Sequence, residues 1–352
     1  MFSNYILTGA TGFLGNTIAW YLHSKGYKCT ALVMHNDEFI LNLPPSTQII
    51  FGDLLEFNSL NGLFDEKNDD TCLIHCAGLI SISSKHDPMI SRINVDGTRN
   101  IMEMVLKHKV KKTIYVSSVH ALPEVTSKKI ILETNNFDEK LVKGQYAKSK
   151  ATASKMVLDY VKKGLDISIV HPSGIIGPND WRCGPTTNTI INYCQGKMNI
   201  ASRGGNNFVD VRDVTEGIIS CSEMGKPGEC YLLTGHSSKI RNILEQVRII
   251  IKGKKIVYLP LWIVKIIAPI YEKIQCRKKQ KPILTPYSAY ALGANSNYSN
   301  QKAKQAFNFS PRPLEETIRD TIQWLKDSRK IPIDLTTNNK KVLKKLSKNK
   351  TH

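Results

Sequence analysis

The sequence predicts an α/β fold: a doubly wound parallel sheet, followed by a smaller and less regular α/β part. Two observations predict the sheet. Apolar runs of strand length alternate with helical patterns five times between residues 5 and 170. Such alternation is typical of parallel strands joined by helices that cover both faces. From about residue 172 the alternation breaks down, which predicts a second part of different construction.

A glycine-rich turn directly follows the first strand. The strand is the apolar run at residues 5–7, and the turn is Thr-Gly-Ala-Thr-Gly-Phe-Leu-Gly at residues 8–15. The next helix places Leu14, Ile18 and Leu22 on one face, because they are four residues apart. Glycines allow a close approach of the backbone to phosphates, and a helix N-terminus offers free N–H groups. This order predicts a nucleotide pyrophosphate site.

The other elements of the sheet follow in order. A long helix is expected at residues 94–107, and an amphipathic helix with apolar residues at 314, 318, 322 and 325 ends the fold. The fourth strand ends in the small residues 76–78, against which a ligand can lie. The expected strands after the first are residues 29–33, 48–51, 73–78, 113–116 and 167–170.

The ends of the second and third strands bear on the nucleotide. An acid after the second strand can hold the ribose 2′-OH of NAD, and an arginine the 2′-phosphate of NADP. The chain has Met34-His35-Asn36-Asp37 there, with neither signal at the strand end, so the choice of cofactor stays open. Asp53, after the third strand, is a candidate acceptor for an adenine amino group and equally a candidate helix cap.

Tyr146 and Lys150 are the candidate proton-transfer pair. At i and i+4 they share one helix face. A phenol with a pKa near 10 needs a neighbouring cation to become a useful acid or base at neutral pH. A serine from Ser117-Ser118, at the end of the fifth strand, could orient a substrate oxygen beside it. The spacing alone is not specific, because Tyr21 and Lys25 share it in the first helix.

Composition limits the classes of function. The 352 residues carry a formal charge of +19, concentrated in residues 252–281, with nine basic and one acidic residue, and 331–352, with six and one. No finger or aromatic-interleaved basic motif supports nucleic-acid binding. Eight cysteines without a C-x-x-C pair, no leader before the first strand and no bilayer-spanning run predict a cytoplasmic protein with free thiols. The histidines show no metal-ligand spacing, so no metal site is expected.

The apolar stretch at residues 256–271 has two interpretations. Broken by prolines and followed by Arg277-Lys278-Lys279, it is either a helix facing the core or an interfacial anchor that makes a weak membrane-surface contact through residues 256–281. Trp181-Arg182 and residues 203–205 are expected in loops over the cleft. The residues after Arg329 are polar and basic, and 331–352 are expected to be a disordered tail.

These motifs together resemble the extended short-chain dehydrogenases/reductases, most closely the group of dihydroflavonol 4-reductases and 3β-hydroxysteroid dehydrogenases. The match runs in family order from about residue 4 to residue 328. The motifs that carry it are residues 8–15, 52–54, 75–78, 94–98, 115–118, Tyr146 with Lys150, 171–174, 208–214 and 309–313.

The resemblance implies a role for each matching residue. Tyr146 is the general acid/base, Lys150 lowers its pKa and holds the nicotinamide ribose, and Ser118, in preference to Ser117, binds the substrate oxygen. His75 and His171 are structural or cofactor-lining rather than catalytic. Met34 stands where NADP users often carry arginine and NAD users an acid, so the cofactor is NADP or NAD. The implied cofactor-binding residues are Gly9, Thr11, Gly12, Phe13, Leu14, Gly15, Asp53, Leu54, Cys76, Ala77, Gly78, Tyr146, Lys150, His171, Pro172 and Ser173.

The resemblance also implies the organisation and the reaction. Residues 1–171 form a Rossmann-type NAD(P)-binding domain, completed by elements from 205–235, and 172–330 mainly bind substrate. The reaction is NAD(P)-dependent hydride transfer to or from a ketone, aldehyde or secondary alcohol, with a homodimer as the usual assembly. The alternatives are a nucleotide-sugar epimerase or dehydratase with tightly held NAD, and a non-catalytic NAD(P)-binding scaffold.

Overall fold

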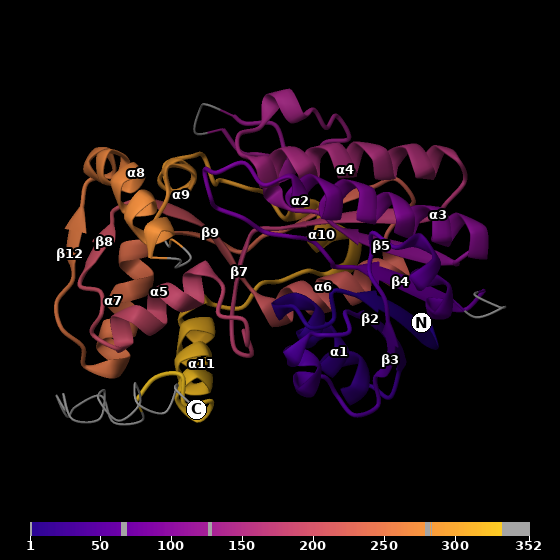
Figure 1. Cartoon of the computed structure of the whole chain (residues 1–352), viewed down its shortest axis with the longest axis horizontal. Helices are drawn as coiled ribbons and strands as arrows, with labels where there is room; N and C mark the ends of the chain where they lie inside the picture. Colours follow the sequence, from indigo (N-terminus) through magenta and orange to yellow (C-terminus); the bar gives the residue numbers. More distant parts are fainter. Residues whose placement is uncertain (1, 65–68, 126–128, 279–281, 283, 333–352) are drawn as a thin grey trace.

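The computed structural model describes residues 2–64, 69–125, 129–278, 282 and 284–332. Its centre is a seven-stranded sheet whose neighbouring strands all pair in parallel (Figure 1). The strands are β1 (Asn4–Thr8), β2 (Lys28–Val33), β3 (Gln48–Phe51), β4 (Thr71–His75), β5 (Lys112–Val116), β6 (Ile167–Pro172) and β10 (Cys230–Leu233). They lie in the order β10-β6-β5-β4-β1-β2-β3, which confirms the predicted doubly wound sheet.

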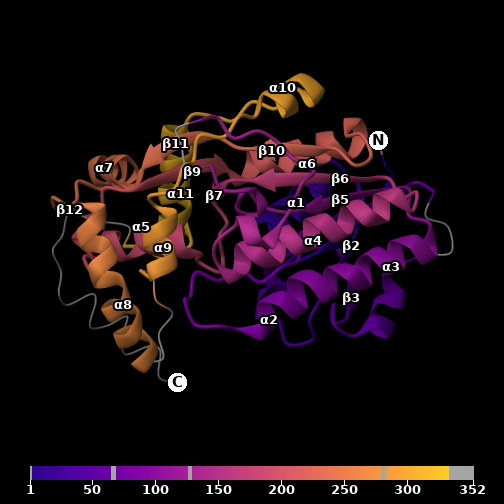
Figure 2. The same ribbon diagram turned by 90° about the horizontal axis from the view of Figure 1, so that it is seen from above.

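Helices cover both faces of this sheet (Figure 2). Each face has its own hydrophobic core, one against α3 and α4 and the other against α1, α6 and α10. The first face carries α2 (Pro88–Ser91), α3 (Thr98–His108) and α4 (Gln145–Lys162), and the second α1 (Phe13–Ser24), α6 (Val211–Met224) and α10 (Gln301–Phe307).

The central strands are buried along their whole length, as parallel strands between two helical layers must be. Every residue of β4 and β5 is buried. The one charged residue in them, Lys112, is compensated, because its Nζ donates to Asp166 Oδ1 (2.6 Å), Ser168 Oγ (3.0 Å) and the Gly225 carbonyl (2.7 Å). A buried ammonium is tolerated only with such partners.

Among the described residues, the second part of the fold contains two small sheets and five helices. Its amphipathic C-terminal helix is confirmed, since Leu314, Ile318, Ile322 and Leu325 are all buried. The sheets are β11 (His236–Lys239), β9 (Gly205–Asp210) and β7 (Gly174–Ile176), and β12 (Val257–Leu259) with β8 (Ile200–Ser202). The helices are α5 (Pro185–Cys194), α7 (Ile240–Ile251), α8 (Leu261–Arg277), α9 (Pro286–Ala291) and α11 (Leu314–Asp327).

The structure corrects one expected helix and bears on a second stretch, for which two interpretations were open. The helix expected to open at Asn94 begins earlier, at α2, and passes through a π-helical turn at Arg92–Gly97 before α3. The stretch at 256–271 is not simply a core segment, because α8 buries only Val264, Ala268 and Glu272. Residues 333–352 of the expected tail lie outside the described residues. Within the described ranges, no helix is both long and apolar enough to cross a membrane.

Candidate active site

The glycine turn lies where β1 meets β4, at the point where the strand order reverses. Gly9 has a φ of +73°, and a Cβ on it would come within 2.7 Å of the Ala77 backbone nitrogen. A Cβ on Gly15 would lie 2.1 Å from the Gly9 carbonyl oxygen. Gly12 is the N-cap residue of α1 and has no side chain that could accept a hydrogen bond. The first-turn N–H groups of Phe13 and Leu14 are therefore not capped by it. The cradle fits a pyrophosphate.

Asp37 and Arg182 meet beside this turn, although they are far apart in sequence. Asp37 Oδ2 accepts from Thr11 Oγ1 (2.6 Å) and from Arg182 Nη2 (2.5 Å). Arg182 Nε also donates to the Thr11 carbonyl at 3.0 Å, and its guanidinium lies 4.3 Å from the Phe39 ring centroid. β2 itself does not end in an acid, but the loop after it places the Asp37 carboxylate beside the glycine turn. The arginine comes from the second part of the fold.

Ser118, Tyr146 and Lys150 come together at the carboxyl end of β5. All three are buried, and Ser118 lies close enough to Tyr146 to lower the pKa of its phenol. Lys150 Nζ donates to the Val116 carbonyl at 2.8 Å and lies 5.0 Å from the Tyr115 ring centroid. Ser117 points elsewhere, since its Oγ pairs with Ser154 Oγ at 2.7 Å. Of the two serines, Ser118 is the one beside the tyrosine.

The electrostatics of the pair differ from the sequence-based expectation. Burial raises the pKa of Tyr146 to about 12, against a smaller lowering by the hydrogen bond with Ser118. Burial also lowers the pKa of Lys150 to about 8. The expectation that Lys150 holds the phenol pKa down is not what this structure shows, because desolvation outweighs the other influences on both groups. The phenol is protonated at neutral pH.

Residues 76–78 connect the glycine turn to Lys150. The Ala77 N–H donates to Thr8 Oγ1 at 3.3 Å. A Cβ on Gly78 would lie 3.1 Å from Asn94 Oδ1 and 3.4 Å from Lys150 Nζ, so the backbone passes close to both. Small residues at this position leave the crevice open between the turn and Lys150.

His75 is held on both sides. Thr98 Oγ1 donates to the Asn94 carbonyl (2.7 Å), so it accepts from His75 Nε2 (3.0 Å), and His75 Nδ1 accepts from Thr8 Oγ1 (2.6 Å). Burial lowers the pKa of His75 to about 3. A neutral imidazole with both nitrogens engaged holds β4 to β1 and α3 and is not free to transfer a proton.

His171 and Ser173 flank the opposite side of the crevice, at and after the end of β6. His171 Nδ1 donates to the Ser118 carbonyl at 3.0 Å, and its ring stacks on Phe137. Burial lowers the pKa of His171 to about 4. Among the described residues, neither His171 Nε2 nor Ser173 Oγ has a hydrogen-bond partner. Buried polar atoms of this kind fit the amide and ribose groups of a nicotinamide nucleotide.

Asp53 and Leu54 lie at the end of β3 as expected, with packing and turn roles. Asp53 Oδ1 accepts from the Leu55 N–H at 2.9 Å, which closes a turn, and the next helix is capped by Glu56 rather than by Asp53. The Leu54 carbonyl accepts from Asn100 Nδ2 at 2.7 Å, and its side chain lies against Gly97. Leu54 therefore fastens this strand end to α3, while Asp53 holds the turn that follows β3.

Asn94 is a residue that the sequence reasoning did not place in the site. Its Oδ1 accepts from the Leu79 N–H (2.7 Å), and its Nδ2 donates to the Leu79 carbonyl (3.0 Å) and to Ser149 Oγ (2.9 Å). Ser149 directly precedes Lys150, so Asn94 links the segment after Gly78 to α4. The motif at residues 94–98 was visible in the sequence, but the π-helical turn that aims Asn94 inward was not.

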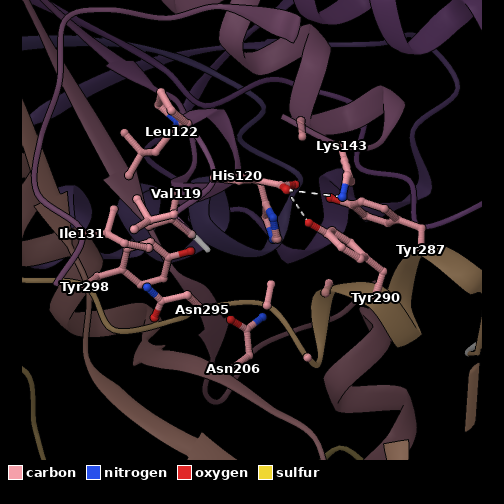
Figure 3. A pocket seen from close by; sticks show the side chains of 17 residues that line it. Val119, His120, Leu122, Ile131, Lys143, Asn206, Tyr287, Tyr290, Asn295 and Tyr298 are labelled. Atoms are coloured by element: carbon pink, nitrogen blue, oxygen red, sulfur yellow. Dashed lines mark hydrogen bonds and ion pairs between the residues drawn. The ribbon is translucent and has the colours of Figure 1, made fainter. Parts of the chain in front are cut away.

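A cavity of about 300 Å³ opens one residue beyond Ser118 (Figure 3). Its polar side holds Lys143 and Glu124 (3.7 Å apart), with Tyr290 hydrogen-bonded to Glu124. His120 lies between the Tyr146 and Tyr287 rings, 6.1 and 6.4 Å from their centroids. The sequence reasoning missed His120, whose only signal was its position two residues after Ser118. The apolar side is formed by Val119, Leu122, Val125, Ile131, Tyr287 and Tyr298.

The sequence matches the NAD dependent epimerase/dehydratase family over residues 5–233. The chain belongs to this family. Together with relatives named as reductases and dehydrogenases, family membership makes the chain an NAD-binding enzyme of the oxidoreductase class. Within the described residues, no group of three or more His, Cys, Asp or Glu side chains could hold a metal ion.

Relatives of this epimerase/dehydratase-family chain match nearly its whole length. A protein of Synechocystis sp. assigned as a dihydroflavonol 4-reductase is 28% identical over 333 residues, which cover 92% of this chain and 94% of that protein. The crystal structure of gox2253 has a TM-score of 0.80 at 29% identity, covering 94% of this chain and 99% of its own. A dTDP-glucose 4,6-dehydratase of Bacillus anthracis in complex with NAD shares the fold, with a TM-score of 0.72 at 19% identity, covering 95% and 99%.

Proposed function

We propose that this enzyme is an NAD(P)-dependent reductase that converts a ketone or aldehyde into an alcohol, with Ser118, Tyr146 and Lys150 as its catalytic residues. The observation that carries the proposal is the buried Tyr146 phenol beside Ser118, next to His120, which lines the adjoining cavity. A protonated phenol there can donate to a carbonyl oxygen. Residues 1–171 hold the cofactor in this proposal, and 172–330 mainly the substrate.

Each side chain has a separate task in the reaction. When bound, the nicotinamide cofactor supplies the hydride for the carbonyl carbon. Ser118 Oγ donates to the carbonyl oxygen and fixes its position. Tyr146 donates its phenolic proton to the same oxygen as negative charge develops there. Lys150 binds the nicotinamide ribose and anchors α4 to the end of β5 through the Val116 carbonyl. The pyrophosphate is held by Gly9, Gly12 and Gly15 with the N–H groups of Thr11, Phe13 and Leu14.

The pKa of Tyr146 predicts opposite pH dependences for the two directions. Because burial raises it to about 12, the acid form needed for reduction predominates at neutral pH. The base form needed for alcohol oxidation increases about tenfold with each pH unit below that pKa. The oxidative kcat/KM should therefore rise steadily between about pH 6 and 9, while the reductive value gains nothing. Initial rates in both directions check this, and an oxidative rate independent of pH would remove Tyr146 as the base.

Asp37 and Arg182 are proposed to set the cofactor preference, with Arg182 favouring NADP. A carboxylate beside the turn accepts from the ribose 2′-OH of NAD, whereas a guanidinium binds the 2′-phosphate of NADP. Arg182→Gln should weaken NADPH binding about 10- to 100-fold and NADH binding much less, since charged hydrogen bonds contribute about 1.5–3 kcal/mol. Asp37→Asn should shift preference toward NADPH. Titration calorimetry of both variants checks this, and equal losses for both cofactors would contradict it.

A nucleotide-sugar epimerase or dehydratase is the second candidate, favoured by the family itself. That chemistry keeps NAD bound and returns the hydride to the same substrate. A carbonyl-substrate screen that follows NAD(P)H absorbance distinguishes the two. Stoichiometric consumption with release of oxidised cofactor supports the reductase, whereas NAD retained through purification without net turnover supports the epimerase. If the protein binds the cofactor but turns over neither class of substrate, it is a non-catalytic NAD(P)-binding scaffold.

A further inference from the structure

The helix α8 exposes a continuous apolar face. Trp262, Ile266, Ile270 and Ile274 recur every four residues and therefore share one side of the helix. Trp262 is 65% exposed, and Ile266 and Ile270 are each 62% exposed. Figures 1 and 2 show α8 at the outer end of the second part, away from the central sheet. These four residues are called the docking face below.

The opposite side of α8 explains why the helix is fixed in this orientation. Val264 and Ala268 pack with Ala289 of α9 in a small separate core. Glu272, the only acidic residue of α8, is turned inward, where its Oε1 accepts from the Ser84 N–H (2.8 Å) and from Ser83 Oγ (3.3 Å). The helix is therefore anchored by its narrow buried side while its apolar side remains outside.

Every charged side chain that α8 exposes is a cation. Lys273 and Arg277 follow Ile270 by three and seven residues, so they lie on the same side as the docking face. Lys265 and Lys278 are exposed as well, and Lys252, Lys254 and Lys255 are exposed just before the helix. A helix with tryptophan, large aliphatic residues and cations on one side, and its acid buried, has the composition of an interfacial membrane helix.

We propose that the docking face binds the surface of an anionic lipid bilayer, with α8 lying parallel to it. The isoleucines and Trp262 enter the headgroup boundary, and the lysines and Arg277 contact lipid phosphates. Charge selects this occupant over a second copy of the chain, because a two-fold contact through the docking face would bring Lys273 and Arg277 against like charges.

The orientation of α8 on the bilayer also has a consequence for substrates. Because α8 packs on α9, which supplies Tyr287 and Tyr290 to the cavity, an apolar substrate dissolved in the bilayer would be delivered beside the site.

Flotation of the full chain with vesicles tests the proposal, independently of the reaction catalysed. Vesicles of equal parts phosphatidylglycerol and phosphatidylcholine should bind the protein, while phosphatidylcholine vesicles should bind it at least about tenfold less, and salt should reduce the binding. Ile266→Asn/Ile270→Asn and Lys273→Glu/Arg277→Glu should each lower the bound fraction at least about tenfold. The control is Ile249→Asn on α7, since Ile249 is 66% exposed and lies outside the docking face. It should bind as the native chain does.

Circular dichroism and gel filtration distinguish a lost lipid contact from misfolding, because each variant should retain the native helix content and size. Absence of binding to anionic vesicles overturns the proposal. Binding that survives both double substitutions also overturns it, and would assign the lipid contact to another basic segment such as residues 331–352, which carry six lysines. Conversion of a native dimer to a monomer by Ile266→Asn/Ile270→Asn, without vesicle binding by the native chain, would show that a second copy covers the face.

Discussion

Tyr146→Phe is expected to lower the reductive kcat/KM by about 10²- to 10⁴-fold, while the affinity for NAD(P)H stays within about twofold. The substitution removes the only proton that the phenol can donate and leaves the ring packed beside His120. Since Tyr146 is buried and only its hydroxyl group beside Ser118 is removed, the loss of stability should be small, about 1 kcal/mol. Steady-state kinetics and calorimetric titration on one preparation separate the two effects.

The chain supplies its own control for this experiment. Tyr21 and Lys25 repeat the spacing of Tyr146 and Lys150 on α1, and Lys25 Nζ lies 5.7 Å from the Tyr21 ring centroid. Tyr21→Phe should leave the rate unchanged, because Tyr21 lies outside the cavity and the crevice. A folded Tyr146→Phe enzyme with native turnover would exclude the proton transfer proposed for Tyr146.

Gly15→Ala is expected to abolish cofactor binding and to destabilise the fold by about 1–3 kcal/mol or more. Helix propensity alone predicts the reverse, since alanine is favoured over glycine by about 1 kcal/mol inside a helix. The close approach makes the substitution destabilising, because the new Cβ would lie 2.1 Å from the Gly9 carbonyl oxygen. Relief of that clash requires α1 to move away from the turn that holds the pyrophosphate.

Gly62→Ala is the matched control. A Cβ on Gly62 would meet only the Ile50 Cγ2 atom, at an ordinary contact distance of 3.4 Å. Thermal unfolding with and without NADPH should show a native melting temperature and a native ligand-induced shift for this variant. For Gly15→Ala both should be reduced, and a native ligand-induced shift would show that the turn does not hold the cofactor.

The sheet could be predicted from the sequence because its signals are local. Each parallel strand is a short apolar run, and each covering helix repeats apolar residues at helical spacing, so the strand–helix alternation is visible residue by residue. The glycine turn at 8–15 and the pair Tyr146 and Lys150 were visible for the same reason, as short motifs next to elements of known type. All of these are in the structure, although β4 ends at His75 and the helical segment expected from Asn94 begins at Pro88.

The parts that could not be predicted depend on contacts between distant segments. Nothing near Arg182 indicates that it pairs with Asp37, which is 145 residues away. The family resemblance favoured Ser118 over Ser117, but the bond from Ser117 to Ser154 could not be read from the sequence. The pKa of Tyr146 was expected to be lowered by Lys150, whereas the depth of burial, which no spacing reveals, raises it. The outward face of α8 was one of two interpretations that the sequence left open.

The most direct test of the proposed function is titration calorimetry of the native protein with NAD, NADH, NADP and NADPH, after its ultraviolet spectrum has been checked for retained nucleotide. We expect the purified protein to carry no nucleotide and to bind the cofactors reversibly, with NADPH preferred through Arg182. NAD that is already present and does not exchange would contradict the reductase and favour the epimerase. Absence of binding by all four nucleotides would contradict the assignment of the glycine turn itself.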